Sequence, residues 1–291
     1  MQLHSSRSSM LELIHSYQKQ KLTIGFVPTM GALHEGHLSL VKKAKTENDK
    51  VIVSIFVNPT QFNNPNDLEA YPQPIKEDTT LLESVATDAL FHPTVQEMYP
   101  TNYTKHTNIH TNLGGLDKVL EGKFRPGHFQ GVVEVVSILF DIIQPNKAYF
   151  GKKDFQQLAI LQQLAKNEYP TLQILPCETT RASNGLALSS RNQRLTPAQR
   201  EDAGCIYQTL VRLENHVQKR DNLAVEKELS RRNLEKNGYE VEYIAIVDSF
   251  SLQEKGQLEI QLGDYITIAI AVWVAGVRLI DNIQFRVNEL L

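Results

Sequence analysis

Apolar runs of strand length alternate with helical patterns along the first two-thirds of the chain. The predicted strands cover residues 23–27, 51–57, 89–92, 148–150 and 172–175. The stretches between them repeat apolar residues at helical spacing. This alternation is typical of βαβ units around a parallel sheet. We therefore expect a Rossmann-like α/β domain over residues 1–177.

The pattern changes after Arg191. The predicted elements there are helices over 197–216, which starts with a proline, and 223–236, followed by strands over 241–247 and 265–275. They predict a smaller α+β domain over residues 178–291. The loop 180–185 is expected to be a hinge between the domains, because Gly185 permits a positive φ.

Composition adds the broad class of protein. The chain has 291 residues, of which 41% are hydrophobic and 22% charged, and its net charge is −3. These values are ordinary for a soluble globular protein and give nucleic-acid binding no support. Cys177 and Cys205 are too few for a disulfide framework, no apolar run has the length of a membrane span, and the N-terminus lacks a signal-peptide layout. We expect a cytoplasmic protein with no membrane partner.

The most informative segment is 28–37, which reads PTMGALHEGH. It follows a predicted buried strand and opens a predicted helix, so His34 and His37 lie three residues apart at a strand-to-helix junction. Ligands of open α/β sheets bind at that edge, and a helix N-terminus there supplies free N–H groups and a positive dipole for an anion. Two ordinary surface or core imidazoles and a zinc pair are the alternatives. The flanking Gly31 and Gly36 favour a built site.

Four further clusters occupy similar positions. They are Asn58-Pro59-Thr60-Gln61-Phe62, the loop 121–129, Gly151-Lys152-Lys153-Asp154 with Gln157, and Leu188-Ser189-Ser190-Arg191-Asn192. Amides at a strand end suit a polar ligand, lysine at a helix start suits an anion, and hydroxyl and guanidinium donors suit phosphate oxygens. For each cluster a structural explanation stays open: a capped turn, a solvated surface turn, an exposed lysine, or a helix cap.

Taken in order, these clusters resemble one family, the pantoate-beta-alanine ligases or pantothenate synthetases. This family belongs to the HxGH nucleotidyltransferase superfamily, whose signatures also occur in class I aminoacyl-tRNA synthetases. The matching blocks are PTMGALHEGH, NPTQF, EGKFRPGHFQG, FGKKDFQQ and GLALSSRN, so the resemblance spans nearly the whole chain.

The resemblance implies the ATP-dependent condensation of (R)-pantoate with β-alanine in the pantothenate and coenzyme A pathway. Pantoate would attack the α-phosphate of ATP to give pantoyl adenylate and pyrophosphate, and the amine of β-alanine would then displace AMP. Because negative charge gathers on phosphorus in the first step, catalysis would rest on positioning and on donors aimed at that charge.

The family's functional residues carry over to matching positions. The implied ATP site comprises Met30, Gly31, Ala32, Leu33, His34, Glu35, Gly36, His37, Gly151, Lys152, Lys153, Asp154, Thr180, Leu188, Ser189, Ser190 and Arg191. The implied catalytic residues are His34, His37, Lys153 and Arg191. Gln61 would contact pantoate and β-alanine, and Gln157 would hold pantoate. Glu121, Arg125 and His128 match a loop near the family's site.

The resemblance also implies Mg²⁺ with ATP, held chiefly by phosphate oxygens and water, with Glu77 and Asp78 as candidate helpers. It implies a homodimer whose C-terminal domain acts as a lid. The chain departs from the family pattern at Asn184, where an aspartate is expected, and at Leu188, where many relatives have methionine.

Two other kinds of function compete with this one. A nucleotidyltransferase that makes a dinucleotide would share the fold, but it would not be expected to combine the amides of 58–62 with Gln157. A non-catalytic nucleotide sensor would bind ATP and form no AMP.

Overall fold

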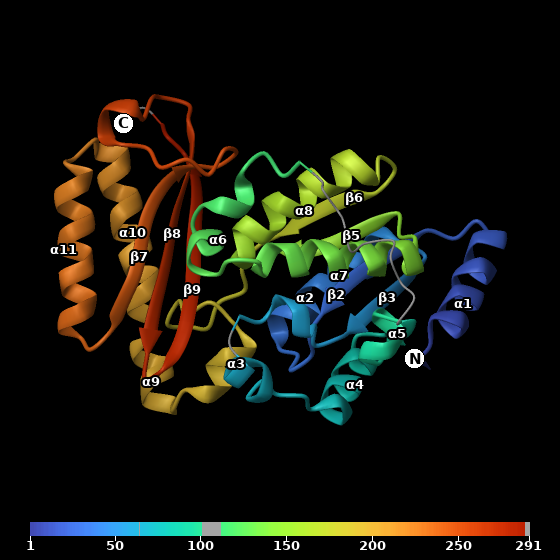
Figure 1. Cartoon of the computed structure of the whole chain (residues 1–291). Helices are drawn as coiled ribbons and strands as arrows, with labels where there is room; N and C mark the ends of the chain where they lie inside the picture. Colours follow the sequence, from blue (N-terminus) through green and yellow to red (C-terminus); the bar gives the residue numbers. More distant parts are fainter. Residues whose placement is uncertain (64, 101–111, 289–291) are drawn as a thin grey trace. The chain divides into compact units, whose positions relative to one another are not determined.

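The structure is a computed structural model that describes residues 1–63, 65–100 and 112–288 (Figure 1). The described chain divides into two compact units. The first unit comprises Met1–Lys152 and Gln157–Glu178, and the second comprises Lys153–Gln156 and Thr179–Leu291. A boundary at one chain position does not describe this division, because the short segment Lys153–Gln156 groups with the second unit.

The first unit is built on a parallel sheet. Its strands within the described residues are β1 (Gln2–His4), β2 (Ile24–Thr29), β3 (Lys50–Ile55), β4 (Ala89–Phe91), β5 (Lys147–Gly151) and β6 (Gln173–Cys177). They lie in the order β1-β4-β3-β2-β5-β6, and every pairing is parallel. The predicted Rossmann-like sheet is confirmed. The sequence reading missed β1, a three-residue edge strand with no buried side chain.

Helices follow the strands, as the βαβ pattern predicts. They are α1 (Arg7–Lys19), α2 (Glu35–Glu47), α3 (Pro65–Glu69), α4 (Ile75–Ser84), α5 (Val95–Met98), α6 (Glu121–Phe124), α7 (His128–Ile143) and α8 (Phe155–Glu168). Short 3₁₀ turns cover Pro59–Gln61, Leu116–Lys118 and Lys152–Asp154. Helix α7 is buried along most of its length, and Phe140 meets Phe26 of β2 edge to face. Its apolar sequence therefore belongs to the core.

Strand β2 marks the point where the strand order reverses. Residues 24–29 pair with β3 on one side, and Gly25 and Phe26 pair with Lys147 and Ala148 of β5 on the other. Such a switch point opens a crevice at the carboxyl ends of the strands, where ligands of doubly wound sheets bind. The segments after β2 and β5 are the ones that border it.

The second unit packs helices on a small antiparallel sheet. Its described elements are α9 (Pro197–Asp202), α10 (Gly204–Lys219), α11 (Leu223–Lys236), β7 (Glu240–Asp248), β8 (Tyr265–Val274), β9 (Val277–Arg286) and 3₁₀ turns over Ser190–Arg194 and Gln257–Glu259. The sheet order is β7-β8-β9. One buried cluster joins Leu210 and Leu213 of α10 to Ile268 and Ile270 of β8.

One sequence expectation for this unit was wrong, and one strand was not predicted. The single helix over 197–216 is broken at Ala203, because Gly204 lies against the neighbouring loop: a Cβ there would lie 2.5 Å from the Asn184 carbonyl oxygen. Strand β9 was missed because its hairpin turn, Ala275-Gly276, has positive φ at both residues but lacks the usual asparagine or aspartate.

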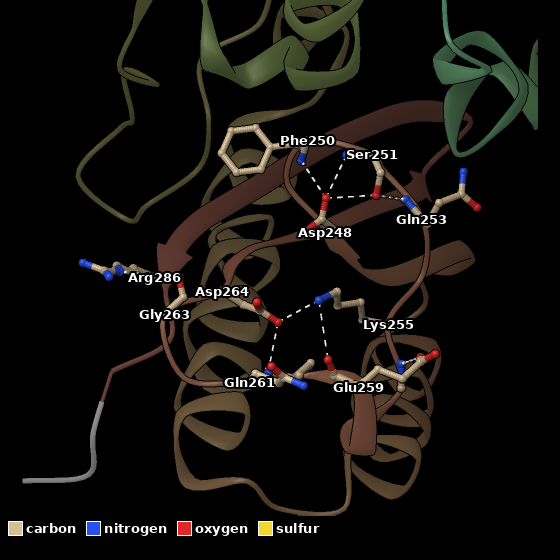
Figure 2. A network of polar contacts seen from close by, with 12 residues as sticks. Asp248, Phe250, Ser251, Gln253, Lys255, Glu259, Gln261, Gly263, Asp264 and Arg286 are labelled. Carbon is tan, nitrogen blue, oxygen red and sulfur yellow. Dashed lines mark hydrogen bonds and ion pairs between the residues drawn. The ribbon is translucent and has the colours of Figure 1, made fainter.

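Two carboxylates hold the loops beside this sheet (Figure 2). Asp248 accepts hydrogen bonds from the Phe250 and Ser251 amides and the Ser251 hydroxyl, at 3.1, 2.8 and 2.9 Å. Asp264 accepts from Lys255 Nζ at 2.7 Å and from the Gln261 amide at 3.0 Å, and these bonds lower the pKa of Asp264. Both acids therefore serve the local structure of the loops.

The helices in the described ranges include none with the length and apolar character needed to cross a membrane.

Candidate active site

The turn between β2 and α2 has an unusual backbone. Gly31 and Ala32 both have positive φ, +80° and +49°, although Ala32 is not glycine. A Cβ on Gly31 would lie 3.0 Å from both Asp78 Oδ2 and Ile55 Cγ2. A side chain there would thus add crowding to an unfavourable backbone conformation.

Hydrogen bonds inside the protein use the amides of this turn. The Gly31 N–H donates to Thr29 Oγ1 at 3.2 Å, and the Ala32 and Leu33 N–H groups donate to Asp78 Oδ2 and Oδ1 at 2.8 and 2.7 Å. The His34 N–H donates to His37 Nδ1 at 3.3 Å. These four amides therefore do not form a backbone cradle for phosphate of the kind found in a P-loop.

The two histidines cap the start of α2. His34 is the N-cap residue, and its Nδ1 accepts the Gly36 N–H at 3.1 Å. The ring centroids of His34 and His37 lie 4.1 Å apart. The expectation of free N–H groups at this helix start is wrong for Gly36, because its N–H donates to the His34 imidazole.

This capping fixes the tautomer of both rings. A neutral imidazole whose Nδ1 accepts a hydrogen bond carries its proton on Nε2. Nδ1 of His34 and of His37 each accepts a backbone N–H, so Nε2–H is the donor of each ring. The turn thus supplies side-chain donors at a helix N-terminus, where an anion is favoured.

Asp78, in the first turn of α4, is 1% exposed. Burial raises the pKa of its carboxyl group, against the hydrogen bonds from Leu33 and Ala32. Glu77 beside it is exposed. Of the two candidate metal helpers, only Glu77 therefore has a solvent-facing carboxylate.

The amide cluster that follows β3 joins this turn. Gln61 Nε2 donates to Met30 Sδ at 3.0 Å, and Gln61 Oε1 accepts from Asn58 Nδ2 at 3.3 Å. Asn58 is buried and also donates to the Gly131 carbonyl at 3.1 Å. Its oxygen accepts the Tyr99 hydroxyl at 2.8 Å. Asn58 is thus the cap of the turn, while Gln61 lies beside the predicted ATP loop.

The start of α7 contacts the same cluster. His128 is buried, and its Nδ1 donates to the Gln61 carbonyl oxygen at 2.8 Å. In α6, the buried Glu121 pairs with Arg125 at 3.7 Å. Burial raises the pKa of Tyr99 to about 12, so its hydroxyl stays a neutral donor. Gln61 is therefore fixed through its main chain and its side chain.

The lysine-rich segment after β5 is a 3₁₀ turn, and α8 starts only at Phe155. Lys152 forms an ion pair with Glu178. Lys153 Nζ lies 3.5 Å from Asp154 Oδ1, and the Lys153 carbonyl accepts from Asn282 Nδ2 at 2.8 Å. Gln157, a half-buried residue in the first turn of α8, belongs to the first unit together with Gly151 and Lys152.

In the second unit, the predicted hinge loop is a tight hairpin. The Leu188 N–H donates to the Thr180 carbonyl, and the Ala182 N–H to the Leu186 carbonyl, both at 2.9 Å. Gly185 has φ +94°, as its sequence context predicts. Whether the loop acts as a hinge stays a prediction.

Arg181 ties this hairpin to β9. Its guanidinium donates to both oxygens of Asp281, at 2.6 and 3.0 Å, and lies 3.8 Å from the centre of the Tyr207 ring. Burial raises the pKa of Asp281, and the pairing with Arg181 opposes that shift. The sequence reading gave Asp281 and Asn282 no role because it had missed β9.

The Ser-Ser-Arg segment caps a 3₁₀ turn. Ser189 Oγ accepts the Arg191 N–H at 3.3 Å, and Ser190 is buried. The Asn192 carboxamide donates to the Ala187 carbonyl at 3.0 Å. The helix-cap alternative therefore describes Ser189 Oγ in this structure, and the half-buried Leu188 and Arg191 flank the capped turn.

The structure brings the predicted residues together in two sets. Met30–His37 lies with Gln61 in the first unit. In the second unit, the predicted Lys153 is connected to the loop that starts at Thr180 by residues that were not predicted: Asn282 bonds to the Lys153 carbonyl, and the adjacent Asp281 pairs with Arg181. In the described residues, no group of three or more His, Cys, Asp and Glu side chains could hold a metal ion.

A doubly wound parallel sheet, with the His34–His37 turn at its switch point, is the architecture of many nucleotide-binding α/β enzymes. The family model for pantoate-beta-alanine ligase matches residues 2–284. The chain belongs to this family, and it is therefore an ATP-dependent ligase that joins pantoate to β-alanine.

Individual relatives agree with this assignment over nearly their whole length. A pantothenate synthetase of Bacteroides thetaiotaomicron is 43% identical over 284 residues, 98% of either chain. The crystal structure of pantothenate synthetase from Thermus thermophilus has a TM-score of 0.87 at 35% identity, covering 99% of this chain and 100% of its own. The Francisella tularensis pantoate-beta-alanine ligase, complexed with beta-gamma ATP and beta-alanine, has a TM-score of 0.80 at 40% identity, with 97% of both chains covered.

Asn184 has a role that aspartate could not fill. Its Nδ2 donates to the Arg200 and Glu201 carbonyls in α9, at 2.8 and 2.9 Å. A carboxylate in its place would face two carbonyl oxygens near a helix C-terminus. We expect Asn184→Asp to lower the free energy of unfolding by about 1 kcal/mol or more. Urea denaturation measures the effect, with Gln162→Glu, which adds the same charge at an exposed position in the middle of α8, as control. An unchanged midpoint for Asn184→Asp would contradict the capping role.

Proposed function

We propose that the turn between β2 and α2 is the phosphate site of this ligase, with His34 and His37 donating Nε2–H to phosphate oxygens. The observation that carries the proposal is the capping arrangement, in which Nδ1 of both rings accepts a backbone N–H. Two oriented donors at a helix N-terminus and at the switch point of the sheet are suited to a polyanion.

In the first step, the carboxylate of pantoate attacks the α-phosphate of ATP, and the bond from the α-phosphate to pyrophosphate breaks. Negative charge gathers on the phosphate oxygens as this happens. Donors that are already oriented stabilise that charge without reorganisation. His37 is the donor that we assign to this developing charge, with His34 beside it.

In the second step, the amine of β-alanine attacks the acyl carbon of pantoyl adenylate, and AMP leaves. A carboxylate alone is a poor acylating agent, so the adenylate supplies the leaving group. We assign Gln61 to the contact with both acids and Gln157 to pantoate. The bonds from Asn58 and His128 that fix Gln61 support its part, because a positioned amide holds the reacting groups in line.

The remaining nucleotide contacts are assigned by the family resemblance. Gly151, Lys152, Lys153 and Asp154 bind the phosphates and ribose, with Lys153 at the phosphates and Asp154 at the ribose. The Thr180 main chain meets adenine, and the segment 188–191 covers the triphosphate through its serine hydroxyls and Arg191. The bond from Asn282 to the Lys153 carbonyl supports a fixed main chain at that position.

Mg²⁺ would enter with ATP, and its chemistry is to neutralise charge on the phosphate oxygens. We propose that phosphate oxygens and water supply most of its ligands. Of the two candidate acids, Glu77 is the exposed one and would be the residue that holds the ion. Asp78 already accepts two backbone N–H groups.

We also propose that the enzyme is a cytoplasmic homodimer whose second unit closes as a lid. The family resemblance supports the dimer and the lid, and the two free cysteines are compatible with a reducing compartment. Sedimentation equilibrium of the purified chain tests the dimer: a monomer at every concentration would exclude it.

AMP release by the purified protein tests the proposed reaction. ATP and Mg²⁺ are supplied with pantoate, with β-alanine, and with both. We expect steady AMP release, with pantothenate formation, only when both acids are present. Folded protein that binds ATP but forms no AMP would be a nucleotide sensor, and pyrophosphate exchange that does not require pantoate would indicate another acceptor for the adenylyl group.

His37→Ala should lower the rate of adenylate formation by at least ~100-fold, the scale on which one charge-stabilising donor acts. The assay is the single-turnover rate of pantoyl adenylate formation. His15→Ala, which removes an exposed imidazole in α1, is the control and should react at the wild-type rate. A near-normal rate for His37→Ala would remove that ring from the charge-stabilising role.

Gln61→Ala should raise KM for pantoate more than KM for ATP, because the amide is assigned to the acid and not to the nucleotide. Initial rates at varied concentrations of each substrate separate the two effects. Gln162→Ala, an exposed glutamine in α8, is the matched control. Equal KM values for pantoate in Gln61→Ala and wild type would take Gln61 out of the site.

A further inference from the structure

Asp78 lies 46 residues after Ala32 and 45 after Leu33 in the chain, and it accepts a hydrogen bond from the amide of each. Its two oxygens accept the Ala32 and Leu33 N–H groups, at 2.8 and 2.7 Å. Hydrogen bonds to a carboxylate are stronger than neutral ones. The carboxylate therefore holds the loop at two consecutive residues.

The held residues include the strained part of the turn. Ala32 has φ +49°, a conformation that costs a non-glycine residue about 1 kcal/mol or more. Such a conformation persists only where the surroundings determine it. The bonds to Asp78, together with the Gly31 N–H to Thr29 Oγ1, provide that determination.

The position of the histidines depends on this turn. Leu33, whose N–H is bonded to Asp78, directly precedes His34, the N-cap of α2. The direction of Nε2 of His34 and His37 follows from where α2 begins, because both rings are bonded to backbone amides at that start. A change at Asp78 thus reaches both imidazoles through the main chain.

A metal-binding role makes a different demand on the same oxygens. A cation bound to Asp78 would compete with the two N–H groups for the carboxylate and would place positive charge beside those donors. The side chain is 1% exposed, which leaves it little access to an ion in solvent.

We propose that Asp78 is a positioning residue of the ligase: its carboxylate fixes the Gly31–Leu33 main chain, and through it the two imidazole donors, and it is not a ligand of Mg²⁺. The inference rests on the proposed phosphate site and extends it to a residue that does not touch substrate. Asp78→Asn tests it with little change of shape. The asparagine oxygen still accepts one N–H, but its NH₂ group faces the other and leaves that amide unsatisfied.

The first measurement is pantoate-dependent exchange of pyrophosphate into ATP at increasing Mg²⁺. Asp78→Asn should lower kcat/KM for ATP at least ~10-fold, because a small displacement of positioned donors is costly. Its half-saturating Mg²⁺ concentration should equal that of the wild type. Glu83→Gln, on the exposed end of α4, is the control and should match the wild type in both respects.

Two outcomes of this assay would overturn the inference. One is a rise in the half-saturating Mg²⁺ concentration with recovery of the rate at high Mg²⁺, which is the signature of a lost ligand. The other is wild-type kcat/KM in folded Asp78→Asn. If the wild-type protein itself shows no pantoate-dependent exchange, it is the proposed function that fails.

A second measurement needs only the wild-type protein, so it holds if Asp78→Asn does not fold. Amide hydrogen exchange is followed by NMR at Ala32 and Leu33, in the absence and presence of Mg²⁺ alone. The inference expects slow exchange at both amides and no change with Mg²⁺. Fast exchange at these amides without Mg²⁺ would show that the Asp78 carboxylate does not hold the loop. Faster exchange when Mg²⁺ is added would show that the carboxylate leaves the amides to bind the ion.

Discussion

The use of backbone N–H groups in the turn between β2 and α2 is the constraint on which the candidate site depends. The amides of residues 31–34 donate to Thr29, Asp78 and His37, and the Gly36 amide donates to His34. Many phosphate sites at such turns use the main chain as the donor. Here the amides of residues 31–34 and 36 bond within the protein, and the donors that we propose for the phosphates are the Nε2–H groups of two imidazoles. Under the proposed function, phosphate recognition at this turn depends on the imidazole side chains and not on these amides.

These hydrogen bonds of the turn explain several features together. The histidines must lie three residues apart so that each can accept an amide at the start of α2. Glycine suits position 31 because its φ is positive and an added Cβ would lie 3.0 Å from Asp78 Oδ2 and Ile55 Cγ2. The turn must be held from outside because Ala32 adopts a left-handed conformation. Gln61, bonded to Met30, lies beside this fixed region and is the residue that we propose for the contact with the two acids.

The second unit shows the same use of buried charge to fix a loop. Arg181 donates to Asp281, to the Gly185 carbonyl and to the Asn282 carbonyl, and its guanidinium lies over Tyr207. A buried ion pair contributes little net stability, but removing one partner leaves a costly unpaired charge. The pair therefore sets the geometry of the 180–188 hairpin.

Strong periodicity made much of the fold predictable. The five parallel strands read from apolar runs were confirmed, and α11 occupies the residues that its pattern indicated. The break at Ala203 could not be read, because it arises from contact of Gly204 with a loop distant in sequence. Strand β9 was missed because its turn lacks the usual residues, and Asp281 and Asn282 were missed with it.

For the candidate site, the sequence motifs indicated which loops form it but not the hydrogen bonds that hold those loops. The segment 28–37 showed where a ligand could bind, yet nothing in it showed that its amides bond to Asp78, Thr29 and the imidazoles. Asp78 was named only as a candidate helper for Mg²⁺, and its bonds to Ala32 and Leu33 could not be predicted because long-range hydrogen bonds leave no local pattern. Residue roles in such a site require the tertiary structure, even where the family is evident from the sequence.

Nitrogen-15 NMR of the imidazole side chains of His34 and His37 tests the central claim most directly. Spectra of the ligand-free protein at pH 8, assigned with the two His→Ala variants, report which ring nitrogen carries the proton. The account predicts the Nε2–H tautomer for both rings, and a shift of both Nε2 signals when ATP is added. An Nδ1–H tautomer for either ring would contradict it, because that ring could not accept the amide that orients it.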